Sequence, residues 1–190
     1  MIDAAFSMLQ EGRVPPPVDE VAERSGVSVS TIFRYFDGLD DLQHVALARF
    51  HERFETLYSI PAIGEGLRRD RIRRFVDARL QLYAAAGAIM AVGRLRAIEH
   101  PPLAAAMMEM RRTLRDQVTA QFAPELAGVT PARSADLLAV IDALTSSEAW
   151  NVMRHSHGRT RRQIRRAWVL SLETLLRPTA EERHDKEVRP

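Results

Sequence analysis

The pattern of apolar positions along this chain is helical almost from end to end. Apolar residues recur three or four positions apart, and no stretch shows the strict alternation that is typical of a half-buried strand. Proline and glycine separate these periodic stretches, for example at Pro61, residues 101–102, Pro124 and residues 157–158. The pattern therefore predicts an all-α protein of about nine helices.

The first of these helices is expected from residue 2 to about residue 12, and two short ones follow within residues 18–36. Longer helices are expected over residues 39–58, 67–86, 89–98, 103–122, 131–155 and 159–176. Residues 178–190 are charged and carry almost no large apolar groups, which predicts a disordered tail.

Residues 18–36 carry the most informative local signal. Gly26 follows a short apolar-periodic stretch and can take the left-handed backbone that ends a helix. Ser28 is a candidate N-cap for a second helix, on which Ile32 and Phe36 are four positions apart. A helix, a short turn and a second helix in this order predict a helix-turn-helix, whose second helix enters a DNA major groove.

The outer face of that second helix supplies the candidate DNA contacts. Its side chains could contact bases or phosphates: Ser28, Val29, Ser30, Thr31, Phe33, Arg34 and Tyr35. The alternative is an ordinary helical hairpin in a bundle core, which would not need the capped turn or its flanking helices.

Four motifs in order strengthen the helix-turn-helix interpretation. They are IDAAF at 2–6, VDEVAERSGVS at 18–28, TIFRYF at 31–36 and DDL at 40–42. This order and spacing resembles the N-terminal domain of the tetracycline-repressor (TetR) family of bacterial transcription regulators, over roughly the first quarter of the chain. The resemblance implies a DNA-binding domain over 1–47 and a ligand-binding and dimerisation domain over 48–177.

Composition fits an intracellular helical protein. The chain has 190 residues, of which 46% are hydrophobic, enough for a substantial core in one or two domains. It has no cysteine, which fits a reducing compartment. We expect no membrane span, because no run of about 18 apolar residues is present, and the N-terminus does not resemble a signal peptide. The expected location is the cytoplasm.

Charge is unevenly distributed. Residues 1–60 carry five arginines and ten acidic residues, a net charge of −5, whereas the rest of the chain is net +7. DNA-binding modules are usually basic, although residues 27–36 carry Arg34 and no acid. Val29 and Leu39 also stand where the resembled family usually has cations. These features motivate an alternative, a TetR-fold dimer that has lost operator binding and acts as a small-molecule binding or scaffold protein.

The last two long helices, 131–155 and 159–176, are apolar around more than one stripe. In the resembled family these helices pair with their copies in a second subunit as a four-helix bundle, which implies a homodimer. The expected interface residues are Leu137, Ile141, Leu144, Ile164, Trp168, Leu172 and Leu175. The alternative is that both helices serve only the core of one chain.

The resemblance also implies a ligand cavity among the middle helices. The candidate effector contacts are Phe75, Arg79, Tyr83, Met90, Arg94, Met107, Met110, Trp150 and Asn151. Methionine suits adaptable apolar pockets, but such a stripe is also typical of plain core. Arg79 or Arg94 could pair with an anionic or polar effector if either points inward.

Other chemistry has little support in the sequence. His155 and His157 are two residues apart near a helix end, whereas metal ligands on one helix need a spacing of three or four. There is no glycine-rich phosphate loop, no GxSxG and no HExxH, so we expect no metal, no cofactor and no enzymatic activity. An enzyme that reuses the C-terminal cavity stays an alternative. The sequence thus predicts a ligand-responsive homodimeric repressor that binds double-stranded operator DNA.

Overall fold

The computed structural model describes residues 1–11, 13, 16–36, 55–98 and 101–177, and all regular structure in these ranges is helical, with no strand. The chain divides into two compact units. The first comprises residues 1–58 and 82–109, and the second comprises residues 59–81 and 110–190. The expected helix over 39–58 lies mostly outside the described residues, as do the domain boundary at 47 and the tail over 178–190. The last residues of that expected helix, Glu55–Tyr58, form a short 3-10 helix, η1.

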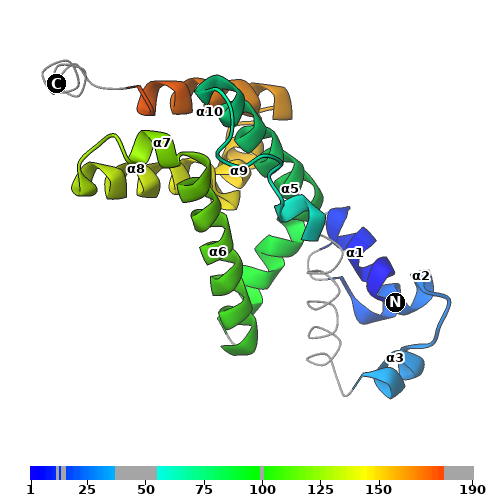
Figure 1. Ribbon diagram of the computed structural model, residues 1–190. Coiled ribbons are helices and arrows are strands. Elements are labelled where there is room, and N and C mark those ends of the chain that lie inside the picture. Colours follow the sequence, from blue (N-terminus) through cyan, green and yellow to red (C-terminus); the bar gives the residue numbers. More distant parts are fainter. Residues whose placement is uncertain (12, 14–15, 37–54, 99–100, 178–190) are drawn as a thin grey trace, which may run out of the picture. The chain divides into compact units, whose positions relative to one another are not determined.

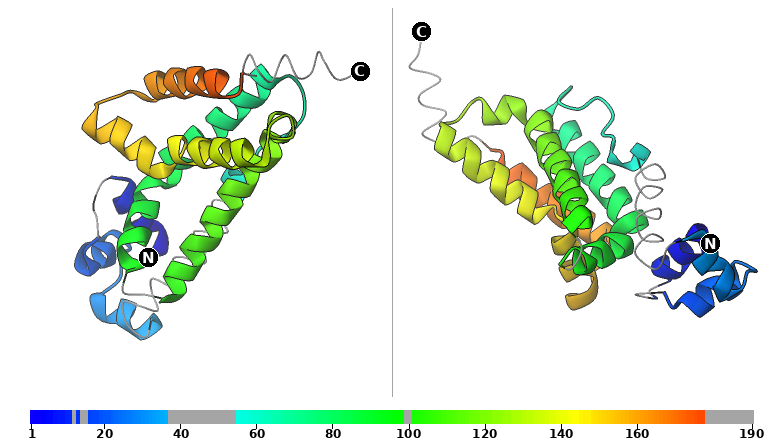
Figure 2. Two further views of the ribbon diagram at one scale, coloured as in Figure 1. Left: turned by 90° about the vertical axis from the view of Figure 1, so that its left-hand side faces the viewer. Right: turned by 90° about the horizontal axis from the view of Figure 1, so that it is seen from below.

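The N-terminal helices of the first unit form one cluster, coloured blue in Figures 1 and 2. They are α1 (Ile2–Gln10), α2 (Val18–Arg24) and α3 (Val29–Tyr35), and α2 contacts both of the others. Six apolar side chains of this cluster have less than a tenth of their surface exposed: Ile2, Met8, Val21, Ala22, Ile32 and Phe36. The expected three-helix arrangement is confirmed.

Helix α5 (Arg68–Arg96) is continuous across the position where the sequence was expected to break. The sequence pattern predicts two helices here, over 67–86 and 89–98, with Gly87 between them. That prediction is wrong, because the flanking alanines are the best helix formers and one glycine costs only about 1 kcal/mol. Gly93 has a packing role, since a Cβ atom there would lie 3.1 Å from Sδ of Met107.

Helix α5 bears on the expectation that the chain has no membrane-spanning helix. One 18-residue window has a mean hydropathy of 1.3, so by length and composition alone the helix could cross a membrane. The core helix of a soluble protein meets the same criterion, and 56% of this window is buried inside the protein. Arg71 and Arg79 are also buried on this helix. We therefore interpret α5 as a core helix.

Helix α6 spans Pro101–Gln121, and its part from Met110 onward belongs to the second unit. The elements that follow it in this unit are α7 (Ala123–Leu126), α8 (Pro131–Leu144), α9 (Ser147–Asn151), a π-helix η2 (Val152–Ser156) and α10 (Arg161–Leu175). The short helix α7 was not predicted. The prediction of a single helix over 131–155 is also wrong, because helical structure is interrupted between α8 and α9. There the Thr145 hydroxyl donates to the Ile141 carbonyl at 2.7 Å, and Ser146 caps α9 by accepting from Ala149 N at 3.0 Å.

A buried glutamine ties the loop before α5 to the end of α6. Gln121 is fully buried; its Oε1 accepts from Gly64 N at 2.9 Å and its Nε2 donates to the Arg71 carbonyl at 2.7 Å. Gly64 has a positive φ of 78°, and a Cβ atom there would lie 2.9 Å from the Ala120 carbonyl oxygen. The loop backbone therefore lies directly against α6, where the side-chain amide of Gln121 bonds it.

We expect Gln121→Leu to destabilise the second unit. Leucine fills a similar volume but leaves the half-buried Gly64 N–H without its acceptor, which costs about 1–3 kcal/mol. Urea unfolding measures the loss. The matched control is Gln81→Leu, at an exposed position of α5, which should change stability by less than about 0.5 kcal/mol. Equal unfolding midpoints for the two variants would contradict this account of the loop.

Candidate nucleic-acid interface

The turn between α2 and α3 has the geometry that the sequence predicted. Gly26 takes a positive φ of 68° directly after the end of α2. Its N–H donates to the Glu23 carbonyl at 3.1 Å, and Val27 N donates to the Ala22 carbonyl at 3.0 Å. These two bonds form a Schellman motif, which satisfies the last carbonyls of a helix and reverses the chain. The predicted role of Gly26 as the helix stop is confirmed.

Ser28 begins the second helix. Its Oγ accepts from Thr31 N at 3.1 Å, as expected for an N-cap, and lies 2.8 Å from both Thr31 Oγ1 and Ser30 Oγ. On the inner side of α3, Ile32 is 1% exposed. The cap and this single buried contact fix which side of the helix faces outward.

The outer face of α3 is open to solvent. Val29 is 38% exposed, Phe33 52% and Tyr35 65%. Ser28, Ser30 and Arg34 are exposed as well, and Thr31 is half-buried. The structure thus brings the seven candidate DNA contacts together at one accessible surface, whereas their contact with DNA stays a prediction.

The arginines in the described part of the first 36 residues differ in whether a carboxylate contacts them. Arg13 pairs with Glu20 at 2.8 Å and Arg24 pairs with Glu11 at 2.7 Å. The hydrogen bond from Arg24 lowers the pKa of Glu11, so this pair is charged at neutral pH. The Arg34 guanidinium lies 5.4 Å from the centre of the Tyr35 ring, and no carboxylate of the described residues contacts it. Arg34 is therefore available to an external anion.

The nine candidate effector contacts are divided between the two units. Tyr83 and Met90 are buried in the first, where Arg94 and Met107 are half-buried. The second contains Phe75, Arg79, Met110, Trp150 and Asn151, of which Phe75, Arg79 and Trp150 are buried. Contact between these residues and an effector stays a prediction.

Arg79 points inward, as the sequence left open, and its guanidinium already has core partners. It donates to Gln117 Oε1 and to the Leu114 carbonyl, both at 2.6 Å, and lies 4.7 Å from the centre of the Phe75 ring. These bonds give Arg79 a structural role in joining α5 to α6.

The expected dimer-interface residues lie mostly in the core of this one chain. Five of them are at most 4% exposed: Leu137, Ile141, Ile164, Trp168 and Leu172. Leu144 and Leu175 are half-buried. The five buried side chains pack inside the unit and have almost no surface to offer a second copy. The exposed large apolar side chains on α8 and α10 are instead Val140, 47% exposed, and Leu170, 62% exposed.

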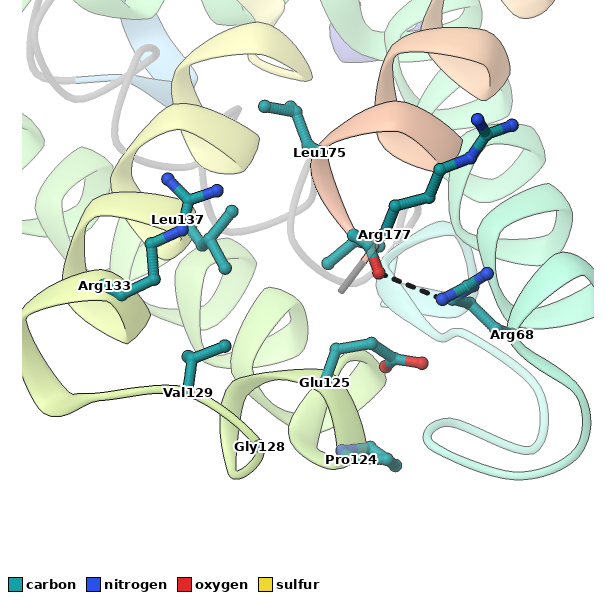
Figure 3. A pocket seen from close by; sticks show the side chains of 10 residues that line it. Arg68, Pro124, Glu125, Gly128, Val129, Arg133, Leu137, Leu175 and Arg177 are labelled. Atoms are coloured by element: carbon teal, nitrogen blue, oxygen red, sulfur yellow. Dashed lines mark hydrogen bonds between the residues drawn. The ribbon is translucent and has the colours of Figure 1, made fainter. Parts of the chain in front are cut away.

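A cavity of about 190 Å³ lies in the second unit, and no candidate effector contact lines it. Figure 3 shows it between the ends of several helices. Its lining residues are Arg68, Pro124, Glu125, Gly128, Val129, Arg133, Leu137, Leu175, Leu176 and Arg177. The sequence does not indicate this cavity, because its arginines come from three separate helix ends, with no local motif to connect them.

The conformation of Gly26 generates a test of the turn. We expect Gly26→Ala to destabilise the packing of α3 by about 1–2 kcal/mol, because a side chain is strained in the left-handed region. A Cβ atom at this position would meet nothing within 4 Å, so the cost comes from the backbone alone. Gly26→Asn should cost less, because asparagine tolerates this conformation. Amide hydrogen exchange of α3 measures both, and identical protection in Gly26→Ala and the unaltered chain would contradict the assigned turn.

Two solved structures have a fold similar to that of this chain. A transcriptional regulator from Rhodococcus sp. Rha1 has a similar structure, with a TM-score of 0.70 and 20% identity over 92% of this chain and 93% of that chain. A proposed TetR-family transcriptional regulator from Rhodococcus sp. has a TM-score of 0.58 and 16% identity over 93% of this chain and 96% of that chain. No protein-family model and no curated protein matches the sequence. The chain therefore has the all-α fold found in TetR-family transcriptional regulators.

Proposed function

We propose that this protein is a DNA-binding transcriptional regulator, a cytoplasmic homodimeric repressor that binds a palindromic operator and is released by a small-molecule effector. The observation that carries the proposal is the exposed outer face of α3, presented by a capped helix-turn-helix. Both structural neighbours are described as transcriptional regulators, which supports a regulatory rather than an enzymatic role.

The side chains of α3 suit major-groove recognition. Arg34 carries a planar fork of donors that can bind N7 and O6 of guanine or clamp a phosphate. The Tyr35 hydroxyl can donate to a phosphate, which would fix the position of the helix on the duplex. The side chain of Val29 or the methyl group of Thr31 can contact a thymine methyl group. Phe33 lies on the same exposed surface.

A dimer would double these contacts. One helix-turn-helix reaches a single half-site, and a two-fold dimer matches a palindrome. The surface that supports pairing is the exposed side of α8 and α10, where Val140 and Leu170 are accompanied by exposed Ala139 and Ala143. Small and apolar side chains of this kind allow two helices to approach closely. Leu144 and Leu175, which are half-buried, could extend the contact.

Two arginines that are paired with carboxylates favour a second candidate function, that of a TetR-fold dimer without operator binding, which acts as a small-molecule binding or scaffold protein. Arg13 and Arg24 are engaged with carboxylates, so fewer cations are free for phosphates than the number of arginines suggests. A mobility-shift assay with DNA from upstream of the protein's own gene and of its neighbours separates the two candidates. A shift at low salt supports the regulator, and no shift from a folded full-length dimer supports the binding or scaffold protein.

The operator found in this way allows a test of Arg34. We expect Arg34→Ala to weaken operator binding by about 1–3 kcal/mol, or about 5- to 150-fold in Kd, if its fork contacts a base. Titration of labelled operator at fixed salt measures the change. Arg162→Ala is the matched control, because Arg162 is an exposed arginine on α10. Unchanged affinity in Arg34→Ala, with the fold intact by circular dichroism, would remove Arg34 from the interface.

Salt dependence gives an independent test of how many phosphates are contacted. Because Arg13 and Arg24 are already paired, we expect a shallow decrease of log Kobs with log salt. A slope steeper than about −5, which corresponds to roughly six neutralised phosphates, would contradict this expectation. The control is a TetR-fold regulator with a basic arm before its first helix, measured on its own operator in the same buffers.

A further inference from the structure

The cavity in the second unit combines an apolar wall with a group of arginines. Val129, Leu137 and Leu175 contribute apolar surface. Arg68 comes from the start of α5, Arg133 from the first turn of α8 and Arg177 from just beyond α10. Figure 3 shows Arg133 on one side of the cavity and Arg68 and Arg177 on the other. Arginine side chains from three segments thus line one cavity whose wall is part polar and part apolar.

The positive charge of these arginines is not balanced within the described residues. Arg68 donates one N–H to the Leu176 carbonyl at 3.0 Å, which positions its guanidinium and leaves further donors. In the described part of the chain, the side chains of Arg68, Arg133 and Arg177 have no carboxylate partner. By contrast, Arg111 pairs with Glu148 at 3.0 Å and Arg165 pairs with Asp77 through two hydrogen bonds.

The one acid that lines the cavity is already neutralised. Oε1 of Glu125 accepts a hydrogen bond from Arg71, and both side chains are largely buried. Arg71 does not itself line the cavity. The Arg71–Glu125 pair is therefore close to neutral, and the other three arginines give the site an excess of positive charge. An anion would accept hydrogen bonds from their N–H groups and offset this charge.

We propose that this cavity binds a small carboxylate with an apolar body. The carboxylate would lie among Arg68, Arg133 and Arg177, and the apolar body against Val129, Leu137 and Leu175. The volume of about 190 Å³ is below the range of about 300–1,000 Å³ for drug-sized ligands, so the ligand is the size of one aromatic ring or a short chain. This inference does not depend on DNA binding.

Three probes separate the charge of the ligand from its apolar body. Benzoate carries both features, benzyl alcohol has the ring without the charge, and acetate has the charge without the ring. By calorimetric titration of the full chain we expect saturable benzoate binding, weaker at high salt, with the other two probes at least about tenfold weaker. Benzyl alcohol that binds as tightly as benzoate, or benzoate that does not saturate, would overturn the proposal.

Variants locate the binding. Arg133→Ala and Arg177→Ala should each weaken benzoate binding about tenfold, because each removes a charge-assisted hydrogen-bond donor. Both side chains are exposed, and Arg133 lies at the positive end of α8, so its removal does not weaken that helix. Arg166→Ala, at an exposed position of α10 outside the cavity, is the matched control and should leave the affinity unchanged.

Equal benzoate affinity in the cavity variants and in Arg166→Ala would place the binding elsewhere and refute the site. Unfolding midpoints of all three variants show whether each one is folded. The titration contains no DNA, so its failure leaves the regulator proposal intact. Failure of operator binding likewise leaves this cavity proposal intact.

Discussion

The left-handed backbone at Gly26 is the constraint on which the candidate interface depends. It lets α2 end in a Schellman motif, so that the chain reverses within two residues and Ser28 can cap α3. With that turn in place, Ile32 is buried and the opposite side of α3 is left exposed. Without it, the same seven residues of α3 could still form a helix, but nothing local would decide which side faces outward.

The surroundings of each arginine separate cations that are bonded inside the protein from cations that are open to solvent. All but one of the 27 basic residues are arginines, so composition alone cannot separate the two groups. Arg71 and Arg79 are buried and bonded to Glu125, Gln117 and backbone carbonyls, which fixes them in the core. Arg34 and Arg133 are exposed, and no carboxylate of the described residues contacts them. An external anion gains most from the second group, because no internal pair has to be broken.

Sequence predicted the parts of the fold whose signals are local. Gly26 and Ser28 act on neighbouring backbone groups, so their roles could be inferred without knowing the tertiary structure. The breaks in the long helices could not be inferred in this way. Gly87 looks like a helix stop but lies inside α5, whereas Thr145 and Ser146, which end α8 and begin α9, lie within a periodic apolar run. Periodicity identifies which residues are apolar on one face, but a helix can stop and restart without disturbing it.

The same limit explains why periodicity did not show which apolar residues of α8 and α10 are buried within one chain. A broad apolar circumference on α8 and α10 indicates that each helix has more than one neighbour, but not which neighbours belong to the same chain. Trp168 and Ile141 are buried within this chain, so the largest apolar groups already belong to its own core. The large apolar side chains that α8 and α10 leave exposed to a second copy are Val140 and Leu170. A dimer built there would rest on close packing of modest side chains, so its strength would depend on the shape of the two surfaces more than on the size of any one apolar group.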